Sequence, residues 1–366
     1  MSCEATTNYY RSACAAVRLS LIRSMDMPTL LVWRITSRRN YEDVCDELRN
    51  SLNTLLLDFV PSPTDLLKLL TRTRALLSGE LALCYILRDA SIIALSLEIY
   101  VGSVWFDTFI DEFGDSPALS GYQVDWSMTH HAERRITSRF ITHSLNVFLS
   151  NGNSITIHAV SSPSACHAIA CSPTSLGITF ITEFSFATAY PRLTFDRRAI
   201  VCWDVLAEGD DSELRMYEQL DACGYTFEED PTVWPEYSTE TRYGSHTTPV
   251  DCVRPLHLCP QQSRYFGDAG SMVCFMDTLS VDVAWLKDRC VPPYGIMAVW
   301  RLQSNVLCDA RCDEFDDLLA PGITVTSIMF ETESFKTAIA LCPSTEKGLY
   351  ASAQSSLSGR ARSVTM

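Results

Sequence analysis

The stretch from residue 75 to residue 101 constrains the fold of this chain more than any other. An apolar segment ends at Leu77, the pair Ser78-Gly79 follows, and a second apolar run continues to Leu87. After a short polar interval, another strand-like segment covers residues 95–101. Serine and glycine together favour a turn between two regular elements. We therefore predict the order strand, glycine turn, helix, loop, strand.

This order resembles the start of the nucleotidyltransferase-like fold, in which a Gly-Ser or Gly-Gly turn precedes a strand carrying Asp-hydrophobic-Asp. The corresponding position here holds Ser96-Leu97-Glu98. Alternate residues of a strand point to one face, so the family's two aspartates can hold Mg²⁺ against the phosphates of a nucleotide. Ser96 supplies a neutral hydroxyl, which leaves Glu98 as the one acid. The resemblance implies an α+β fold with a mixed sheet flanked by helices.

In such folds a third carboxylate comes from a neighbouring strand. The best candidate for that strand is 154–160, which follows the Asn151-Gly152 turn and offers Thr156 and His158 at alternate positions. Neither residue is an acid. One carboxylate where three are expected argues against Mg²⁺-dependent transfer, and Glu98 then has the plainer interpretation of an exposed strand residue.

Charge and composition exclude several classes of protein. The net charge of −15 and the isoelectric point near 4.9 disfavour general nucleic-acid binding, which needs a basic surface. No secretory signal and no long apolar run is recognisable, so we expect no membrane association. Fifteen cysteines without an export signal indicate reduced thiols and a cytoplasmic or nuclear location.

Changes in composition divide the chain into four predicted parts. These are a helical segment at 1–60, an α/β domain at 61–225, an irregular cysteine-containing region at 226–351 packed on it, and a disordered tail at 352–366.

Three finer predictions concern local structure. In the first part, Asn40 is the expected N-cap of a helix with apolar residues at helical spacing. A polar loop or insertion is expected over 114–133. The Asn-Gly-Asn sequence at 151–153 predicts a hairpin between 139–150 and 154–160.

The N-terminal part also resembles an adaptor-binding motif. A short helix starting at Pro28 and leading through Ser37-Arg38 into another helix resembles the second half of an F-box. The first helix of such a motif would cover 13–24, but the usual Leu-Pro-x-Glu start is absent. The alternative is a plain helical hairpin packed on the main domain.

Several short motifs together are similar to a large family of uncharacterised fungal proteins. In that family a nucleotidyltransferase-like core often follows an F-box-like N-terminus, and Asp-Leu-Asp-hydrophobic-Tyr-Val stands where this chain has Ser96 to Val101. The similarity covers about residues 27–310. The motifs are Ser78-Gly79-x-x-Ala82-Leu83, Leu97-Glu98-Ile99-Tyr100-Val101, Ala189-Tyr190-Pro191-Arg192-Leu193-Thr194 and Cys259-Pro260-x3-Arg264-x3-Asp268-x-Gly270-Ser271.

A second candidate site is a structural zinc centre in the third part. His246, Cys252 and Cys259, joined by Cys308 and Cys312, would supply soft ligands for a tetrahedral ion. The spacing is not that of a tight Cys-x-x-Cys knuckle. Reduced structural thiols are the alternative interpretation.

Two functional classes follow from these observations. The first is a non-catalytic interaction or scaffold protein, with protein partners, whose fold has lost its metal-binding acids. The second is an altered Mg²⁺-dependent nucleotidyltransferase that uses Glu98, with the Ser78-Gly79 turn holding phosphates through backbone N–H groups. The second class needs another acid beside Glu98; Asp89 and Asp107 are the nearest in sequence.

Overall fold

The computed structural model of the protein describes much of the chain as far as residue 277 and a few short segments beyond it. The described residues are 16–116, 125–130, 140–201, 211–237, 257–260, 262, 264–266, 268, 270–277, 297–300, 302 and 326–328. The predicted tail at 352–366 lies outside them, and the predicted division into four parts stays a prediction.

Helices form the N-terminal end of the described chain. They are the segment 16–24, α2 (Met27–Arg34), α3 (Arg38–Leu56) and α4 (Pro63–Thr73). The predicted cap at Asn40 is wrong, because the N-cap of α3 is Ser37, whose hydroxyl accepts the backbone N–H of Asn40 at 3.2 Å. An N-cap has extended backbone just before the helix, and Asn40 already lies in the first turn.

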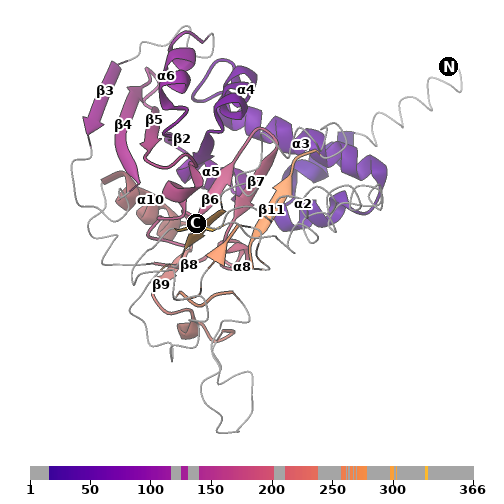
Figure 1. Ribbon diagram of the computed structural model, residues 1–366. Helices are drawn as coiled ribbons and strands as arrows, with labels where there is room; N and C mark the ends of the chain where they lie inside the picture. Colours follow the sequence, from indigo (N-terminus) through magenta and orange to yellow (C-terminus); the bar gives the residue numbers. More distant parts are fainter. Residues whose placement is uncertain are drawn as a thin grey trace, which may run out of the picture.

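A mixed sheet of eight strands lies at the centre, in the order β11-β7-β6-β1-β2-β5-β4-β3 (Figure 1). Within the described part of this sheet, β2 and β5 run parallel and the other neighbouring pairs run antiparallel. The predicted fold class, an α+β mixed sheet flanked by helices, is confirmed. The strands are β1 (Leu76–Ser78), β2 (Ser96–Gly102), β3 (Asp125–His130), β4 (Ile141–Phe148), β5 (Ser154–Val160), β6 (Thr179–Ile181), β7 (Ser185–Thr188) and β11 (Met272–Phe275).

The predicted order of elements around the glycine turn is confirmed. β1 ends at Ser78, α5 (Gly79–Leu87) begins at the glycine, and β2 follows. β5 lies beside β2, where the third strand was expected, and forms the predicted hairpin with β4.

The predicted loop over 114–133 is wrong in part, because residues 125–130 form β3 and pair with β4. The sequence of β3, Asp-Trp-Ser-Met-Thr-His, alternates polar and apolar residues, which is a strand pattern. Its polar surroundings in the sequence conceal that pattern.

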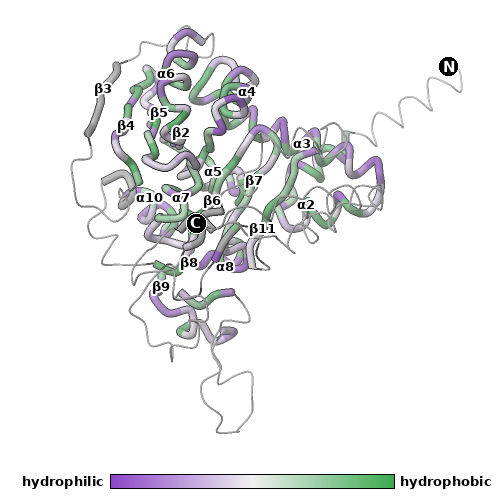
Figure 2. Tube along the Cα trace, viewed as in Figure 1, coloured by the Kyte–Doolittle hydropathy of each residue, from purple (hydrophilic) through white to green (hydrophobic). Residues whose placement is uncertain are grey.

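The two sides of the sheet pack against different elements. On one side, apolar residues of β1, β2, β4 and β5 form the main core with α3, α4, α5 and α6 (Phe106–Gly114). Hydrophobic stretches recur along the strands and the helices that meet there (Figure 2). On the other side, Phe180 of β6 belongs to a second cluster with Trp234 and Trp300.

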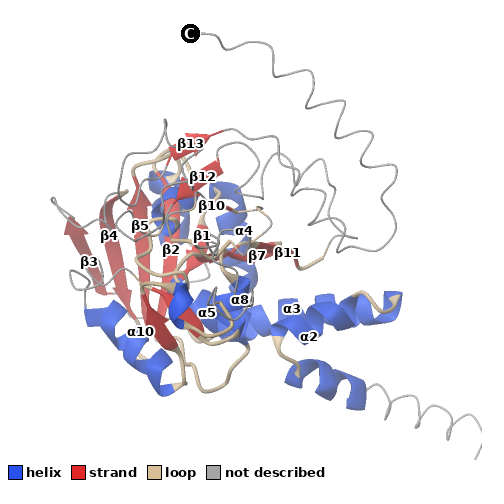
Figure 3. Ribbon diagram, turned by 90° about the horizontal axis from the view of Figure 1, so that it is seen from below, coloured by secondary structure: helices blue, strands red, loops and turns tan. Residues whose placement is uncertain are grey.

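The remaining elements are short, apart from one helix of twelve residues. They are α7 (Cys166–Ile169), α8 (Pro191–Phe195), β8 (Arg198–Ile200), α10 (Asp211–Ala222), β9 (Thr226–Glu228), the 3-10 helix η2 (Pro231–Val233), β10 (Arg264–Tyr265), β12 (Met297–Trp300) and β13 (Thr326–Ile328). β8 pairs with β9, and β10, β12 and β13 form a small sheet visible in Figure 3. None of the described helices is long and apolar enough to cross a membrane.

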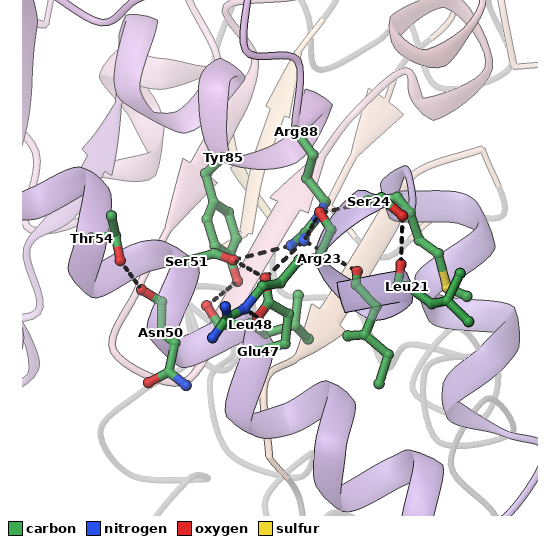
Figure 4. Close-up of polar contacts among 12 residues, drawn as sticks. Leu21, Arg23, Ser24, Glu47, Leu48, Asn50, Ser51, Thr54, Tyr85 and Arg88 are labelled. Carbon is green, nitrogen blue, oxygen red and sulfur yellow. Dashed lines mark hydrogen bonds and ion pairs between the residues drawn. The ribbon is translucent and has the colours of Figure 1, made fainter. Parts of the chain in front are cut away.

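A buried ion pair ties the N-terminal helices to α5 (Figure 4). The Arg88 guanidinium pairs with the Glu47 carboxylate at 2.9 Å, and each side chain is 8% exposed. Arg88 also donates to the carbonyl groups of Met25 at 2.9 Å and Arg23 at 3.2 Å, and Ser51 donates to Glu47 at 2.8 Å. These hydrogen bonds compensate the two charges for their loss of water.

A second arginine, Arg34, joins α2 to β11, which is an edge strand of the central sheet. The buried Arg34 side chain donates to the carbonyl groups of Phe275 at 2.5 Å and Met276 at 3.1 Å. Its guanidinium also lies 4.4 Å from the centre of the Tyr41 ring. The N-terminal helices therefore pack on the main core, as the alternative to the F-box resemblance requires. The F-box resemblance itself stays a prediction.

Two of the short sequence motifs meet in a buried hydrogen-bond network around Arg264. Arg264 is fully buried, and its guanidinium donates to Asp268 at 2.5 and 2.9 Å and to the Ala189 carbonyl at 2.7 Å. It also lies 4.5 Å from the centre of the Tyr190 ring. A Cβ on Gly270 would lie 2.1 Å from the Cβ of His257, so only glycine fits there. The spacing of Arg264, Asp268 and Gly270 in this motif is thus explained by their buried contacts.

Candidate functional site

Polar side chains occupy alternate positions of three neighbouring strands. Along β2 and β5, partly exposed polar residues alternate with fully buried apolar residues. The register places Glu98 opposite Thr156 and Tyr100 opposite His158. The polar positions are Ser96, Glu98 and Tyr100 on β2, Ser154, Thr156 and His158 on β5, and Ser144 and Asn146 on β4. We call this set the polar face of the sheet.

The Glu98 carboxylate lies against the turn at Gly79. Ser78 stands directly opposite Glu98 in the pairing of β1 with β2. A Cβ built on Gly79 would lie 2.5 Å from both the Cδ and the Oε1 atom of Glu98. Gly79 also has a φ of +70°, in the left-handed region that favours glycine. The backbone conformation therefore favours glycine at position 79, and a Cβ there would also displace the Glu98 carboxylate.

Tyr100 holds the other oxygen of this carboxylate. Its hydroxyl donates to the Oε2 atom of Glu98 at 2.7 Å. The Tyr100 ring lies on the His158 ring, with 4.6 Å between the ring centres and 33° between the planes. The Nδ1 atom of His158 shares a hydrogen bond of 2.7 Å with the buried Ser144 hydroxyl. A continuous row of contacts thus crosses β2, β5 and β4.

The predicted position of the third acid carries no carboxylate. The Thr156 hydroxyl donates to the Oδ1 atom of Asn146 on β4 at 3.1 Å. This bond and the His158 contacts join β5 to its neighbours. Thr156 and His158 therefore stabilise the pairing of the strands.

An acid that the sequence analysis missed, Glu80, lies at Ser96. Its Oε2 atom accepts the backbone N–H groups of Leu95 at 2.8 Å and Ser96 at 3.0 Å, and the Ser96 hydroxyl at 3.3 Å. Glu80 directly follows Gly79, in the first turn of α5, where acids are common because they complement the helix dipole. That ordinary preference hid its contact with β2. Its place directly after the glycine turn is the signal that points to it.

The two acids nominated to assist Glu98 are placed elsewhere. Asp89 pairs with Arg197 at 2.7 Å. The Ser91 hydroxyl, which donates to Asp89 at 2.6 Å, is the main cause of a lowered pKa for that carboxyl. Asp107 is exposed in the first turn of α6. Among the described contacts, neither acid reaches Glu98.

The donors on the polar face do not fit a pair of magnesium ions. Magnesium prefers carboxylate and other hard oxygen ligands in octahedral geometry. The strand positions at issue offer one carboxylate, Glu98, and the neighbouring Glu80 carboxylate accepts hydrogen bonds from Leu95 and Ser96. The other side chains there are the hydroxyls of Ser96 and Thr156 and the imidazole of His158. Within the described residues, no three His, Cys, Asp or Glu side chains are grouped to hold a metal ion.

The zinc prediction falls mostly outside the described residues. His246, Cys252, Cys308 and Cys312 all lie there. Cys259 is described, and its buried side chain packs in the second hydrophobic cluster with Trp300 and Phe266. A structural zinc site stays a prediction.

A separate cleft of about 730 Å³ lies between α4, α6 and the turn from β6 to β7. Both of its basic residues are paired within its walls, since Lys68 contacts Asp65 and Arg72 contacts Glu112. Burial raises the pKa of Glu183, although Thr71 donates a hydrogen bond to that carboxyl. The lining also holds Asp111 and Asp115, so its charge is acidic overall, and no ligand class follows from these residues.

Comparison with known proteins adds one slight likeness. No family model and no curated protein matches the sequence. The structure of a CCA-adding enzyme in complex with CTP is similar to this chain with a TM-score of 0.27 and 14% sequence identity. The match covers 56% of this chain and 44% of that chain, so it spans less than half of the enzyme. A likeness this slight carries no argument about activity.

Proposed function

We propose that this chain is a non-catalytic interaction or scaffold protein, built on a nucleotidyltransferase-like sheet that has lost its metal-binding acids. The observation that supports the proposal most is that side chains of the polar face form hydrogen bonds with one another. Tyr100 holds Glu98, Asn146 accepts from Thr156, and Ser144 bonds His158. A site for in-line phosphoryl transfer instead directs its carboxylates at metal ions.

The proposed partners are proteins, in the cytoplasm or the nucleus. The net charge of −15 opposes binding to the phosphates of nucleic acids. Described cysteines that form no disulfide, such as Cys45 and Cys84, suit a reducing compartment. On the basis of the F-box resemblance, we further propose that residues 1–60 dock on an adaptor protein. The full chain and a double variant of exposed helix residues, Val32→Asp with Ile35→Asp, would be compared for adaptor capture; equal capture counts against that docking.

Calorimetry with each ribonucleoside triphosphate tests the main proposal. The wild type, Glu98→Ala and the control variant Glu42→Ala, which changes an exposed acid on α3, would be titrated with and without Mg²⁺. We expect no metal-dependent heat from the wild type or from the control. Mg²⁺-dependent binding that is lost in Glu98→Ala and kept in Glu42→Ala would contradict the proposal.

One observation favours the alternative, an altered Mg²⁺-dependent nucleotidyltransferase. The Glu80 carboxylate lies at Ser96, where the family carries its first aspartate. Two carboxylates, Glu80 and Glu98, thus flank the Ser78-Gly79 turn. If the alternative is right, Glu80→Gln and Glu98→Gln each abolish Mg²⁺-dependent nucleotide binding. Retention of that binding in either variant counts against it.

A further inference from the structure

We infer that Asn151 is a site of spontaneous covalent modification, at which deamidation releases the turn between β4 and β5 from the end of α3. The reaction needs only water from the solvent. The inference is independent of the proposed function, because it rests on the geometry of one turn and not on the polar face of the sheet.

The sequence of the turn supplies the reactive pair. Asparagine is followed by glycine at one place in the chain, Asn151-Gly152, and both residues are exposed. Gly152 has a φ of +90°, in the left-handed region that favours glycine. No atom of the described residues lies within 4 Å of the position that a Cβ would take there. The glycine therefore puts no side chain in the way of attack by its own backbone nitrogen.

Deamidation proceeds through a ring that these two residues form. The backbone nitrogen of Gly152 attacks the Cγ atom of Asn151, and the new C–N bond closes a succinimide ring. The Cγ–Nδ2 bond breaks, and ammonia leaves with the proton of the Gly152 N–H. Water then opens the ring at either carbonyl. Attack at Cγ gives aspartate, whereas attack at the main-chain carbonyl gives isoaspartate, in which the chain continues through the side chain.

The Asn151 amide holds the turn against the chain just beyond Leu56, where α3 ends. Its Nδ2 atom donates to the Asp58 carbonyl at 2.8 Å, and its Oδ1 atom accepts the backbone N–H of Asn153 at 3.0 Å. The Asn153 side chain donates to the same Asp58 carbonyl at 3.1 Å. One carbonyl group beyond α3 thus receives both asparagine side chains of the turn.

Deamidation replaces the donor at position 151 with an acceptor. An asparagine amide both donates and accepts hydrogen bonds, whereas an ionised carboxylate only accepts them. The aspartate product sets a carboxylate oxygen against the Asp58 carbonyl oxygen, so one of the two side-chain hydrogen bonds to that carbonyl is lost. Isoaspartate also adds a methylene group to the main chain, which changes the geometry of the turn. Both products weaken the attachment of the turn to α3.

The hydrogen bonds of the intact turn control the rate of the reaction. The Gly152 N–H donates to the Leu149 carbonyl at 3.0 Å, so the nitrogen must leave this acceptor before it can attack. The Asn151 side chain must also leave the Asp58 carbonyl. Opening of the turn therefore precedes ring closure. Asn153→Ala removes the second hydrogen bond to Asp58 without changing a reacting atom, so this variant should open more often and react faster.

Deamidation of the full chain, followed at 37 °C and mildly alkaline pH, tests the inference. Peptide mapping by mass spectrometry would measure the aspartate and isoaspartate formed at each asparagine. Asn50 is the matched control, because it is also exposed but lies within α3 and is followed by serine. We expect Asn151 to convert at least tenfold faster than Asn50 in the wild type, and faster still in Asn153→Ala. Conversion of Asn151 no faster than that of Asn50 overturns the inference, and equal rates in the wild type and Asn153→Ala contradict control by the Asp58 contact.

A second measurement tests the release of the turn. Asn151→Asp reproduces the aspartate product, and Asn50→Asp makes the same chemical change on α3 as a control. Backbone amides of residues 149–153 should exchange with deuterium faster in Asn151→Asp than in the wild type, and the melting temperature should be lower. Asn50→Asp should leave the exchange of these amides unchanged. Unchanged exchange in Asn151→Asp would show that the Asn151 amide does not hold the turn, which overturns the release.

Discussion

The two faces of β2 and β5 differ in what their side chains do. On one face Leu97, Ile99, Ile155 and Ile157 are all 0% exposed and belong to the main core. On the other, the residues between them are partly exposed and are engaged by hydrogen bonds and ring contacts, as Glu98, Thr156 and His158 are. The apolar face supports the fold, while the polar face carries the candidate site.

Under the proposed function, this difference explains how the fold persists although metal-binding acids are lost. Aspartate and serine at position 96 both suit a partly exposed strand position, so their exchange leaves the apolar face untouched. A change at Leu97 or Ile99 would instead open a cavity in the core. Loss of a metal-binding acid is therefore compatible with an intact sheet. Three predictions test this comparison.

The largest effect is expected in the helical layer that covers the apolar face. Arg88→Met leaves the buried Glu47 carboxylate without its nearer cationic partner, with Arg23 at 3.6 Å as the other, and should lower the free energy of unfolding by up to about 3–5 kcal/mol. Urea denaturation would measure it. Arg38→Met, which breaks an exposed pair with Glu42, is the control and should cost about 0.5 kcal/mol or less. Similar losses in the two variants would show that burial does not make the Arg88 pair special.

A smaller effect is expected from neighbouring residues on the two faces of one strand. Ile157→Ala creates a cavity in the main core and should cost about 2–4 kcal/mol. Thr156→Ala removes one partly exposed hydrogen bond and should cost about 1 kcal/mol or less. Both values come from chemical denaturation. A larger loss for Thr156→Ala than for Ile157→Ala would contradict the division of labour between the faces.

The smallest effect concerns pH. His167 on α7 is 2% exposed, and burial lowers the pKa of its imidazole. The unfolded chain then takes up this proton at a higher pH than the folded chain, so stability falls as the pH drops through the ordinary histidine pKa of about 6.5. Melting temperatures from pH 8 to pH 5 should therefore decline less steeply in His167→Gln than in the wild type. An unchanged slope would exclude His167 as a source of the pH dependence.

Local features of the fold could be predicted from the sequence, because their signals lie within a few residues. The strand, glycine turn, helix and strand over 76–102 follow from apolar runs and one turn pair. The hairpin of β4 and β5 follows from Asn151-Gly152. The cap of α3 was misplaced by three residues, since Ser37 and Asn40 are both good cap formers and only the backbone conformation decides between them.

The candidate site depended on contacts that sequence spacing does not encode. Ser96 and Glu98 were nominated from their positions on one strand, whereas Glu80 reaches the same strand from a helix 16 residues earlier. The part of His158 in fixing Tyr100 depends on the parallel register of β2 and β5. Likewise, the hydrogen bond from Arg264 to the Ala189 carbonyl joins residues 75 positions apart. Periodicity gives the faces of strands, but only the tertiary fold decides which faces meet.

The contact of Arg34 with the end of β11 also has a consequence for biosynthesis. Its acceptors, the carbonyl groups of Phe275 and Met276, come 241 and 242 residues later in the chain. At about 5–20 residues per second, a ribosome needs roughly 12–48 s to add that length of chain. During that interval α2 emerges before the groups that receive its buried guanidinium have been made. The packing of α2 therefore stays incomplete until β11, the last of the described strands of the central sheet in chain order, has been translated.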